Sequence, residues 1–285
     1  MKTLGVIANG GKPSAPEVLR RLQAKAAGLG LDLLPDPATA LLMGKPGAAT
    51  IQEVLDRVDA IMVLGGDGTM LRTFREMAGR DLPVIGVNLG SLGFLTSVAE
   101  HDLERALECI TSGEFTTSLR AVGECVLERS GQMLGDYRFL NEVVVASQSS
   151  RVVTLSLAVN GESVSHSVCD GLIVSTPTGS TGHSLSAGGP VVLPTARVFI
   201  VSLICPHTLS TRPLVLTDDA VIRVTVSNSS GPMSLTADGQ VGQPLEEGDG
   251  ITLRRSSRSI RFIHLPGYSY FTVLRQKLHW RGSNV

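Results

Sequence analysis

The first 112 residues alternate between short apolar runs and longer segments with a helical spacing of apolar residues. Apolar runs of five or six residues predict buried strands, whereas apolar residues three or four positions apart predict helices. The strands expected are Leu4–Ala8, Ala60–Leu64 and Pro83–Asn88, and the helices are Ala15–Leu29, Ala49–Val58, Leu103–Ile110 and a segment from Leu71 through Phe74 to Met77. Leu31–Lys45 shows neither pattern and is expected to be irregular. Strands that alternate with helices indicate an α/β domain with a parallel, Rossmann-like sheet, whose ligands bind beyond the carboxyl ends of the strands.

After about residue 115 the pattern changes to short β-rich runs separated by turn signals such as Asn160-Gly161. The expected strands are Glu124–Arg129, Glu142–Ala146, Val152–Val159, Ser163–Cys169, Val198–Ile204, Val221–Val226, Met233–Ala237, Ile251–Arg254 and Ile260–His264. Many short strands without intervening helices predict a β-rich, sandwich-like C-terminal domain. We therefore expect an α/β domain over residues 1–112 and a β-rich domain over 113–265. The tail 266–285 has helical spacing from Tyr270 to Trp280 and is expected to pack back on the first domain.

Composition narrows the class of protein. With 42% hydrophobic and 18% charged residues the chain is globular rather than disordered. A net charge of −1 argues against nucleic acid as the main partner. There is no long apolar span or basic leader, so we expect no membrane and a cytoplasmic location. Four dispersed cysteines without a C-x-x-C spacing indicate reduced thiols.

The strand Ala60–Leu64 ends in Gly65-Gly66-Asp67-Gly68-Thr69, where a helix is expected to begin. Glycines at such a turn allow positive φ and close approach of a ligand, and the amide groups at a helix start suit a phosphate. Asp67 would repel phosphate unless it binds a metal or accepts a proton from a nucleophile. The turn therefore indicates a phosphoryl-transfer site; the alternative is a tight turn in which Asp67 caps the helix.

Two other loops carry candidate chemistry. The run from Asp170 to Pro190 is dense in hydroxyls and glycines, which suits sugar hydroxyls and phosphates, although a surface linker has the same composition. The loop Asn9–Pro13 follows the first strand and is too short for a Walker A phosphate loop. An ordinary turn and a turn that approaches phosphate remain equally open for it.

Five motifs occur in an order that resembles the bacterial NAD kinases, and the resemblance covers nearly the whole chain. They are Gly65–Thr69, Asn141-Glu142, Asp170–Pro190, Cys205-Pro206-His207-Thr208-Leu209 and Asp238-Gly239-Gln240. Gly-Gly-Asp-Gly-Thr alone is also found in diacylglycerol and sphingosine kinases, whereas Asn-Glu followed by Thr-Pro-Thr-Gly-Ser-Thr is more specific. The resemblance implies transfer of the ATP γ-phosphate to the 2′-hydroxyl of the NAD adenosine ribose, giving NADP.

The resemblance also implies roles for individual residues. Asp67 would accept the proton of the hydroxyl, and the ATP phosphates would lie on Gly65, Gly66, Gly68 and Thr69. Mg²⁺ or another divalent metal would arrive with ATP, without an assigned protein side chain. The residues implied to contact NAD are Asp67, Gly68, Arg72, Phe94, Asn141, Glu142, Asp170, Thr181, Gly182, His183, Ser184, Leu185, Ser186 and Gln240. Asp170 would come from a neighbouring subunit of a homodimer or homotetramer.

Some positions depart from the family pattern. His183 stands where tyrosine is common, Gly182 where alanine is common, Leu203 where proline is frequent, and Val168 where a basic residue is frequent. Arg72 is equally compatible with a solvated charge on a helix face. Two other functions share part of the pattern: a lipid kinase with the same glycine motif, and a non-catalytic NAD(P)-binding regulator.

Overall fold

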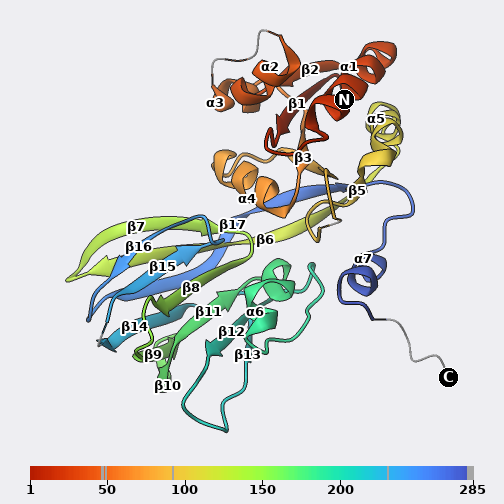
Figure 1. Cartoon of the computed structure of the whole chain (residues 1–285). Helices are drawn as coiled ribbons and strands as arrows, with labels where there is room; N and C mark the ends of the chain where they lie inside the picture. The colour runs from red at the N-terminus through yellow and green to blue at the C-terminus, as the bar shows by residue number, and fades with distance from the viewer. Residues whose placement is uncertain (46–47, 49, 92, 230, 281–285) are drawn as a thin grey trace, which may run out of the picture. The chain divides into compact units, whose positions relative to one another are not determined.

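The computed structural model describes residues 1–45, 48, 50–91, 93–229 and 231–280, and the chain folds into two compact units (Figure 1). The first unit comprises Met1–Leu119 and Ile260–Val285, and the second comprises Arg120–Ser259. The chain passes from one unit to the other within two strands, β6 (Thr116–Arg129) and β17 (Gly250–His264).

The first unit contains a parallel sheet in the order β2-β1-β3-β4, continued by the end of β17. Its strands are β1 (Thr3–Ala8), β2 (Asp32–Pro35), β3 (Ala60–Gly65) and β4 (Pro83–Asn88), and the short β5 (Val98–Ala99) pairs with β4. Ala8 pairs with Leu64, and Gly65 pairs with Asn88, so these strands end at the same edge. The predicted α/β class with a parallel sheet is confirmed.

Helices pack on both faces of this sheet. Leu4, Val6 and Ala8 point into a core shared with α1 (Ala15–Leu29) and α5 (Leu103–Ser112). Because side chains alternate along a strand, Gly5 and Ile7 face the other side. That side carries α2 (Pro37–Met43), α3 (Ile51–Leu55) and α4 (Asp67–Glu76).

The expectation that residues 31–45 are irregular was wrong, because this segment forms β2 and α2. The four-residue β2 lies at the sheet edge and is only partly buried, so it lacks a continuous apolar run. Asp36 then caps α2 by accepting a hydrogen bond from the Thr39 amide at 3.0 Å, and Pro37 follows at the first helical position. The helix expected over 49–58 is shorter, Ile51–Leu55, with its cap at Thr50; Ala49 lies outside the described residues.

The second unit is a β-sandwich, as predicted. Over the described residues, one sheet has the strand order β13 (Leu214–Thr217), β12 (Val198–Ile204), β11 (Gly171–Ser175), β8 (Glu142–Ser147), β15 (Met233–Ala237) and β16 (Val241–Leu245). The other contains β10 (Glu162–Cys169), β9 (Val153–Val159), β14 (Ile222–Ser229), β17, β6 and β7 (Gln132–Phe139). Strands of both sheets contribute side chains to one hydrophobic core.

The prediction for this unit needs three corrections, and the first is that the strands β7, β13 and β16 were not expected. Residues 250–264 form one long strand, β17, rather than two, and the polar stretch between the two apolar runs is part of this strand. The loop expected after β11 contains two short helices, η2 (Thr178–Thr181) and α6 (His183–Ser186). In the tail, Ser269 caps α7 (Tyr270–Lys277).

None of the helices in the described part of the chain combines the length and apolar character needed to cross a membrane.

Candidate active site

The Gly65–Thr69 turn joins β3 to α4 at the carboxyl edge of the parallel sheet. Gly66 is extended (φ −120°, ψ −171°), and Asp67 is the first residue of α4. The amides of Thr69 and Met70 donate to the Gly66 carbonyl at 2.9 and 3.2 Å, which closes the first helical turn. The positive end of the α4 dipole therefore lies at the edge where parallel sheets bind ligands, and this geometry favours an anion.

The glycines of this turn allow close packing and the approach of a ligand, and they do not adopt the left-handed backbone conformation. The expectation of positive φ was wrong, because none of Gly65, Gly66 and Gly68 adopts it. A Cβ atom on Gly65 would lie 2.4 Å from the Thr69 Oγ1, so no larger residue fits. At Gly66 and Gly68 a Cβ would meet nothing within 4 Å, so a ligand can approach the backbone there.

The Asp67 carboxylate is held by the loop that follows β4. Its Oδ2 accepts a hydrogen bond from the Phe94 amide at 2.9 Å, and its Oδ1 accepts from the Leu95 amide at 3.0 Å and the Thr96 amide at 3.3 Å. Gly93 permits this approach, since a Cβ there would lie 1.9 Å from Oδ1. Asp67 is not a helix cap: its side chain bonds to this loop, and Gly66 occupies the cap position. The half-buried carboxylate is thus fixed in direction.

The loop after β1 lies at the same edge. The Asn9 amide donates to the Leu64 carbonyl at 2.8 Å, and the Asn9 side chain contacts the Thr69 hydroxyl at 3.5 Å. The Lys12 Nζ atom lies 3.6 Å from the position of a Cβ on Gly90. Within the described chain, no hydrogen bond or ion pair engages this half-buried ammonium. The sheet edge therefore carries a positive charge from Lys12 as well as the negative charge of Asp67.

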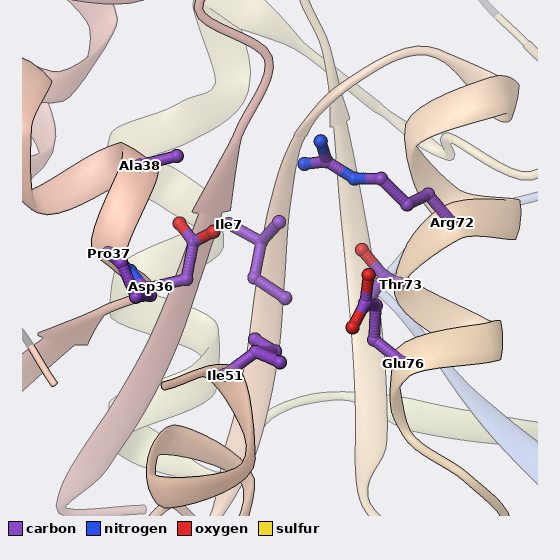
Figure 2. A pocket seen from close by; sticks show the side chains of 8 residues that line it. All are labelled: Ile7, Asp36, Pro37, Ala38, Ile51, Arg72, Thr73 and Glu76. Carbon is purple, nitrogen blue, oxygen red and sulfur yellow. The ribbon is translucent and has the colours of Figure 1, made fainter. Parts of the chain in front are cut away.

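A cavity of about 240 Å³ opens beside the end of β1, between α2, α3 and α4 (Figure 2). Its apolar wall includes Ile7 and Ile51, and Asp36, Arg72 and Glu76 contribute charged groups. Arg72, which the sequence marked as a candidate, extends from α4 over Ile7 (Figure 2).

In the second unit, Asn141 and Glu142 stand at the start of β8. The Asp238 carboxylate positions this chain segment by accepting hydrogen bonds from the amides of Leu140 (2.9 Å), Asn141 (2.7 Å) and Glu142 (3.1 Å). Burial, with a smaller effect of the nearby Asp238 charge, raises the pKa of Glu142 to about 7.

Three buried polar atoms gather around this segment without a partner among the described residues. They are the Asn141 Oδ1, the Glu142 Oε2 and the Thr178 Oγ1. Buried polar atoms are nearly always hydrogen-bonded in folded proteins. Three unsatisfied atoms on adjacent segments therefore indicate a place where a ligand supplies the missing bonds.

The loop after β11 packs closely against Asn141 and Glu142. The Thr176 hydroxyl donates to the Leu140 carbonyl at 2.6 Å, and a Cβ on Gly179 would lie 2.3 Å from the Asn141 carbonyl oxygen. A Cβ on Gly182 would lie 3.1 Å from the Glu142 Oε2. The structure therefore brings Gly182, of the predicted Thr181–Ser186 segment, to the Asn141-Glu142 pair.

The remaining predicted residues of this segment differ in exposure. Thr181 and Leu185 are half-buried, whereas His183 and Ser186 are exposed. Ser184 is fully buried, and its hydroxyl lies 3.4 Å from that of Ser202, so this residue attaches the loop to β12.

Gln240 and Asp170 are the two remaining predicted residues of this unit. Gln240 is exposed and lies in the turn between β15 and β16, two residues after Asp238. Asp170 precedes β11, whose first residue pairs with Ala146 and whose last pairs with Glu142. At ~3.3 Å per residue, Asp170 is therefore roughly 16–20 Å along the strands from the Asn141-Glu142 pair.

Sequence reasoning missed Thr178, Asp238 and Asp36 as individual candidates. Thr178 and Asp238 lie in the motifs Thr-Pro-Thr-Gly and Asp-Gly-Gln. Only the folded chain shows that the Thr178 hydroxyl is unsatisfied and that the Asp238 carboxylate accepts hydrogen bonds from three amides. Asp36 was hidden in the segment expected to be irregular. Within the described residues, no three His, Cys, Asp or Glu side chains form a potential metal site.

Two family models match the chain. The ATP-NAD kinase N-terminal domain matches residues 4–115, and the ATP-NAD kinase C-terminal domain matches residues 140–265. The chain belongs to the NAD kinase family. The NAD kinase of Syntrophotalea carbinolica is 40% identical over 282 residues, covering 98% of this chain and 99% of that protein. The NAD kinase of Heliobacterium modesticaldum is 42% identical over 283 residues, with the same coverage of 98% and 99%.

Solved structures of the NAD kinase family agree with this fold. An NAD kinase from Archaeoglobus fulgidus in complex with ATP superposes with a TM-score of 0.77 at 27% identity, covering 98% of this chain and 100% of that one. Yeast NADH kinase complexed with NADH has a TM-score of 0.90 at 24% identity, covering 100% and 89%, and shows the same fold.

Proposed function

We propose that this protein transfers the γ-phosphate of ATP to the 2′-hydroxyl of the NAD adenosine ribose and thereby produces NADP. The observation that carries the proposal is the Asp67 carboxylate, oriented by three backbone amides beside an open glycine turn at a helix start. Family membership supports the same activity.

Asp67 acts in this proposal as the proton acceptor for the ribose hydroxyl. Phosphoryl transfer depends on alignment and charge neutralisation more than on covalent chemistry. A carboxylate already fixed by the loop after β4 needs no reorganisation when the hydroxyl arrives, which is the condition for efficient general-base catalysis.

The phosphates of ATP are assigned to the turn Gly65, Gly66, Gly68 and Thr69. Open space at Gly66 and Gly68 supports this assignment, because phosphate oxygens must reach backbone donors. We also assign Lys12 to the phosphates of ATP. Its ammonium has no ion pair within the described chain, and its positive charge reduces the repulsion between Asp67 and a phosphate. Of the two readings of the Asn9–Pro13 loop, its place beside this turn supports the phosphate-approaching one.

The divalent metal is expected to arrive with ATP. Mg²⁺ binds through one or two carboxylates together with substrate phosphates rather than in a complete protein cage. The Asp67 carboxylate, with room for phosphate beside it at Gly66 and Gly68, fits that mode. The metal would neutralise charge on the transferred phosphate when bound.

The adenosine of NAD is assigned to the second unit. The unsatisfied Asn141 Oδ1 and Glu142 Oε2 can accept hydrogen bonds from adenine or ribose, and the Thr178 hydroxyl can donate one. Segment Thr181–Ser186 lies next to them through Gly182. The assignment of Gly68, Phe94, Asp170 and Gln240 to NAD rests on the family pattern.

We further propose a cytoplasmic homodimer or homotetramer. The separation of Asp170 from Glu142 along β11 supports the idea that Asp170 serves the site of a neighbouring subunit. Light scattering during gel filtration measures the subunit count, and a monomer that is fully active would contradict a shared site.

The two other functions fit less well. A lipid kinase needs an apolar acceptor cleft, whereas the Asn141-Glu142 cluster offers unsatisfied polar atoms. A non-catalytic regulator has no need of an oriented Asp67. A coupled assay with NAD, ATP and Mg²⁺ should produce NADP; phosphorylation of diacylglycerol without NADP formation would favour the lipid kinase.

A further inference from the structure

We infer that the cavity between α2 and α4 binds the nucleoside of the phosphate donor, with Asp36 accepting hydrogen bonds from the ribose hydroxyls. This inference rests on the proposed phosphoryl-transfer function, since the turn next to the cavity is where the donor phosphates are placed. It assigns Arg72 to the donor rather than to NAD.

The topology of the first unit places the cavity where such sheets bind nucleotides. In the order β2-β1-β3-β4, the second strand lies on one side of β1, and the third and fourth strands lie on its other side. The order in which strands are added to the sheet therefore reverses between β1 and β3. Ligands of open parallel sheets bind outside the carboxyl ends at this switch point. Ile7 of β1 lines the cavity, and the Gly65–Thr69 turn follows the neighbouring β3.

Asp36 occupies a position with a known use in related sheets. In dinucleotide-binding folds an acidic residue after the second strand accepts a hydrogen bond from a ribose hydroxyl. Asp36 directly follows β2, is buried, and uses its Oδ1 to cap α2. Its second carboxylate oxygen has no partner among the described residues and can accept from a ligand.

The charges around the cavity indicate how a nucleotide would be oriented. Asp36 and Glu76 line it from opposite sides (Figure 2), and within the described chain neither forms an ion pair with Arg72. Two carboxylates would repel phosphates, but they accept hydrogen bonds from hydroxyl or amino groups. The uncharged nucleoside therefore enters the cavity, and the phosphates stay on the side of Arg72 and the glycine turn.

The distances along α4 are compatible with one nucleotide. Asp67 and Arg72 are five residues apart, which is ~7.5 Å along a helix. A cavity of about 240 Å³ lies just below the roughly 300–1,000 Å³ of sites that enclose whole drug-sized ligands. This size suits a nucleoside rather than a dinucleotide. Ile7 and Ile51 provide apolar surface for the base.

The test measures binding of adenosine 5′-(β,γ-methylene)triphosphate, its 2′,3′-dideoxy form and inorganic tripolyphosphate to the full-length protein by calorimetry with Mg²⁺. The wild-type protein should bind the ribose form about 10- to 100-fold more tightly than the dideoxy form. The dideoxy form lacks the hydroxyls that donate hydrogen bonds to the Asp36 carboxylate. Asp36→Ser keeps a residue that caps α2 and should bind both forms with the same, weaker affinity. Its affinity for tripolyphosphate should be unchanged, whereas Arg72→Met should weaken all three ligands.

Two variants control for folding and charge. Asp32→Ser removes the same charge at the opposite end of β2 and should bind like wild type. Ala38→Trp fills the cavity mouth from an exposed position and should weaken the nucleotide at least tenfold without affecting tripolyphosphate.

The inference would be overturned if Asp36→Ser still preferred the ribose form over the dideoxy form as strongly as wild type does. Wild-type nucleotide affinity in Ala38→Trp would also overturn it, even if the enzyme makes NADP. A wild-type protein that shows the binding pattern but makes no NADP would instead overturn the proposed function.

Discussion

At Glu142 a single carboxyl group combines burial, a neighbouring negative charge and an unsatisfied oxygen. Burial first, and Asp238 second, raise its pKa to about 7 from an ordinary value of 4.5. Between these pH values the folded protein holds a proton that the unfolded chain has lost. The stability of the ligand-free protein therefore falls as pH rises from 4.5 to 7, by on the order of 3 kcal/mol.

We expect NAD binding to tighten as pH rises from 6 to 8. A ribose or adenine donor bonds best to the ionised Glu142, so NAD binding should release a proton below pH 7. Calorimetry in two buffers of different ionisation enthalpy measures both the affinity and the proton. Glu142→Gln should flatten the pH profile and raise the KM for NAD while leaving the KM for ATP nearly unchanged. A larger effect on ATP than on NAD would mean that the two nucleotide sites are exchanged.

Asp67→Asn should lower kcat by roughly 10²–10⁴, because the base is lost while the shape is kept. Asparagine has one acceptor oxygen in place of two, so one of the Phe94 and Leu95 amides loses its partner. We therefore also expect a loss of about 1–3 kcal/mol in unfolding free energy. Steady-state kinetics, thermal melting and NAD calorimetry separate the two effects. A variant that retains a tenth of the wild-type turnover would remove Asp67 from the base role.

Among the structural elements, the loop after β4 fixes the catalytic geometry. A Cβ on Gly93 would lie 1.9 Å from the Asp67 Oδ1, so Gly93→Ala must displace either the loop or the carboxylate. We expect a loss of about 1–3 kcal/mol in stability and a fall in kcat of at least tenfold, with less effect on the KM for NAD. Gly28→Ala is the matched control. Gly28 lies inside α1, and a Cβ there would meet no atom within 4 Å, so this variant should be slightly more stable than wild type. If Gly93→Ala has wild-type kcat, the close packing does not orient Asp67.

The elements that the sequence predicted well are those whose burial is continuous or strongly periodic. The strands β1, β3 and β4 are buried along nearly their whole length and appear as apolar runs. The missed strands β2, β7, β13 and β16 are partly exposed, so pairing with neighbours rather than their own pattern determines them. Similarly, Asp67 was visible in its motif, but its anchors at Phe94, Leu95 and Thr96 come from 27 to 29 residues away.

At the scale of the whole molecule, each unit has its own hydrophobic core, and the two share the strands β6 and β17. The proposed donor contacts, at Lys12, Asp36, the Gly65–Thr69 turn and Arg72, all belong to the first unit. The unsatisfied atoms assigned to the NAD adenosine belong to the second. The two substrates should therefore order different parts of the chain, because bound ligand suppresses local opening of the backbone it contacts.

Hydrogen exchange with mass spectrometry measures this separation. Adenosine 5′-(β,γ-methylene)triphosphate with Mg²⁺ should slow exchange in peptides covering residues 9–14, 36–39 and 65–73, with little change in 176–190. NAD should slow exchange mainly in 140–143 and 176–190, while α5, at residues 103–112, serves as an internal control for both ligands. Asp67→Asn should show the same NAD pattern, because the base is not needed for adenosine binding. If the ATP analogue protects 176–190 and leaves 65–73 unchanged, the donor has been assigned to the wrong unit, and the roles of Lys12 and Asp36 fail with it.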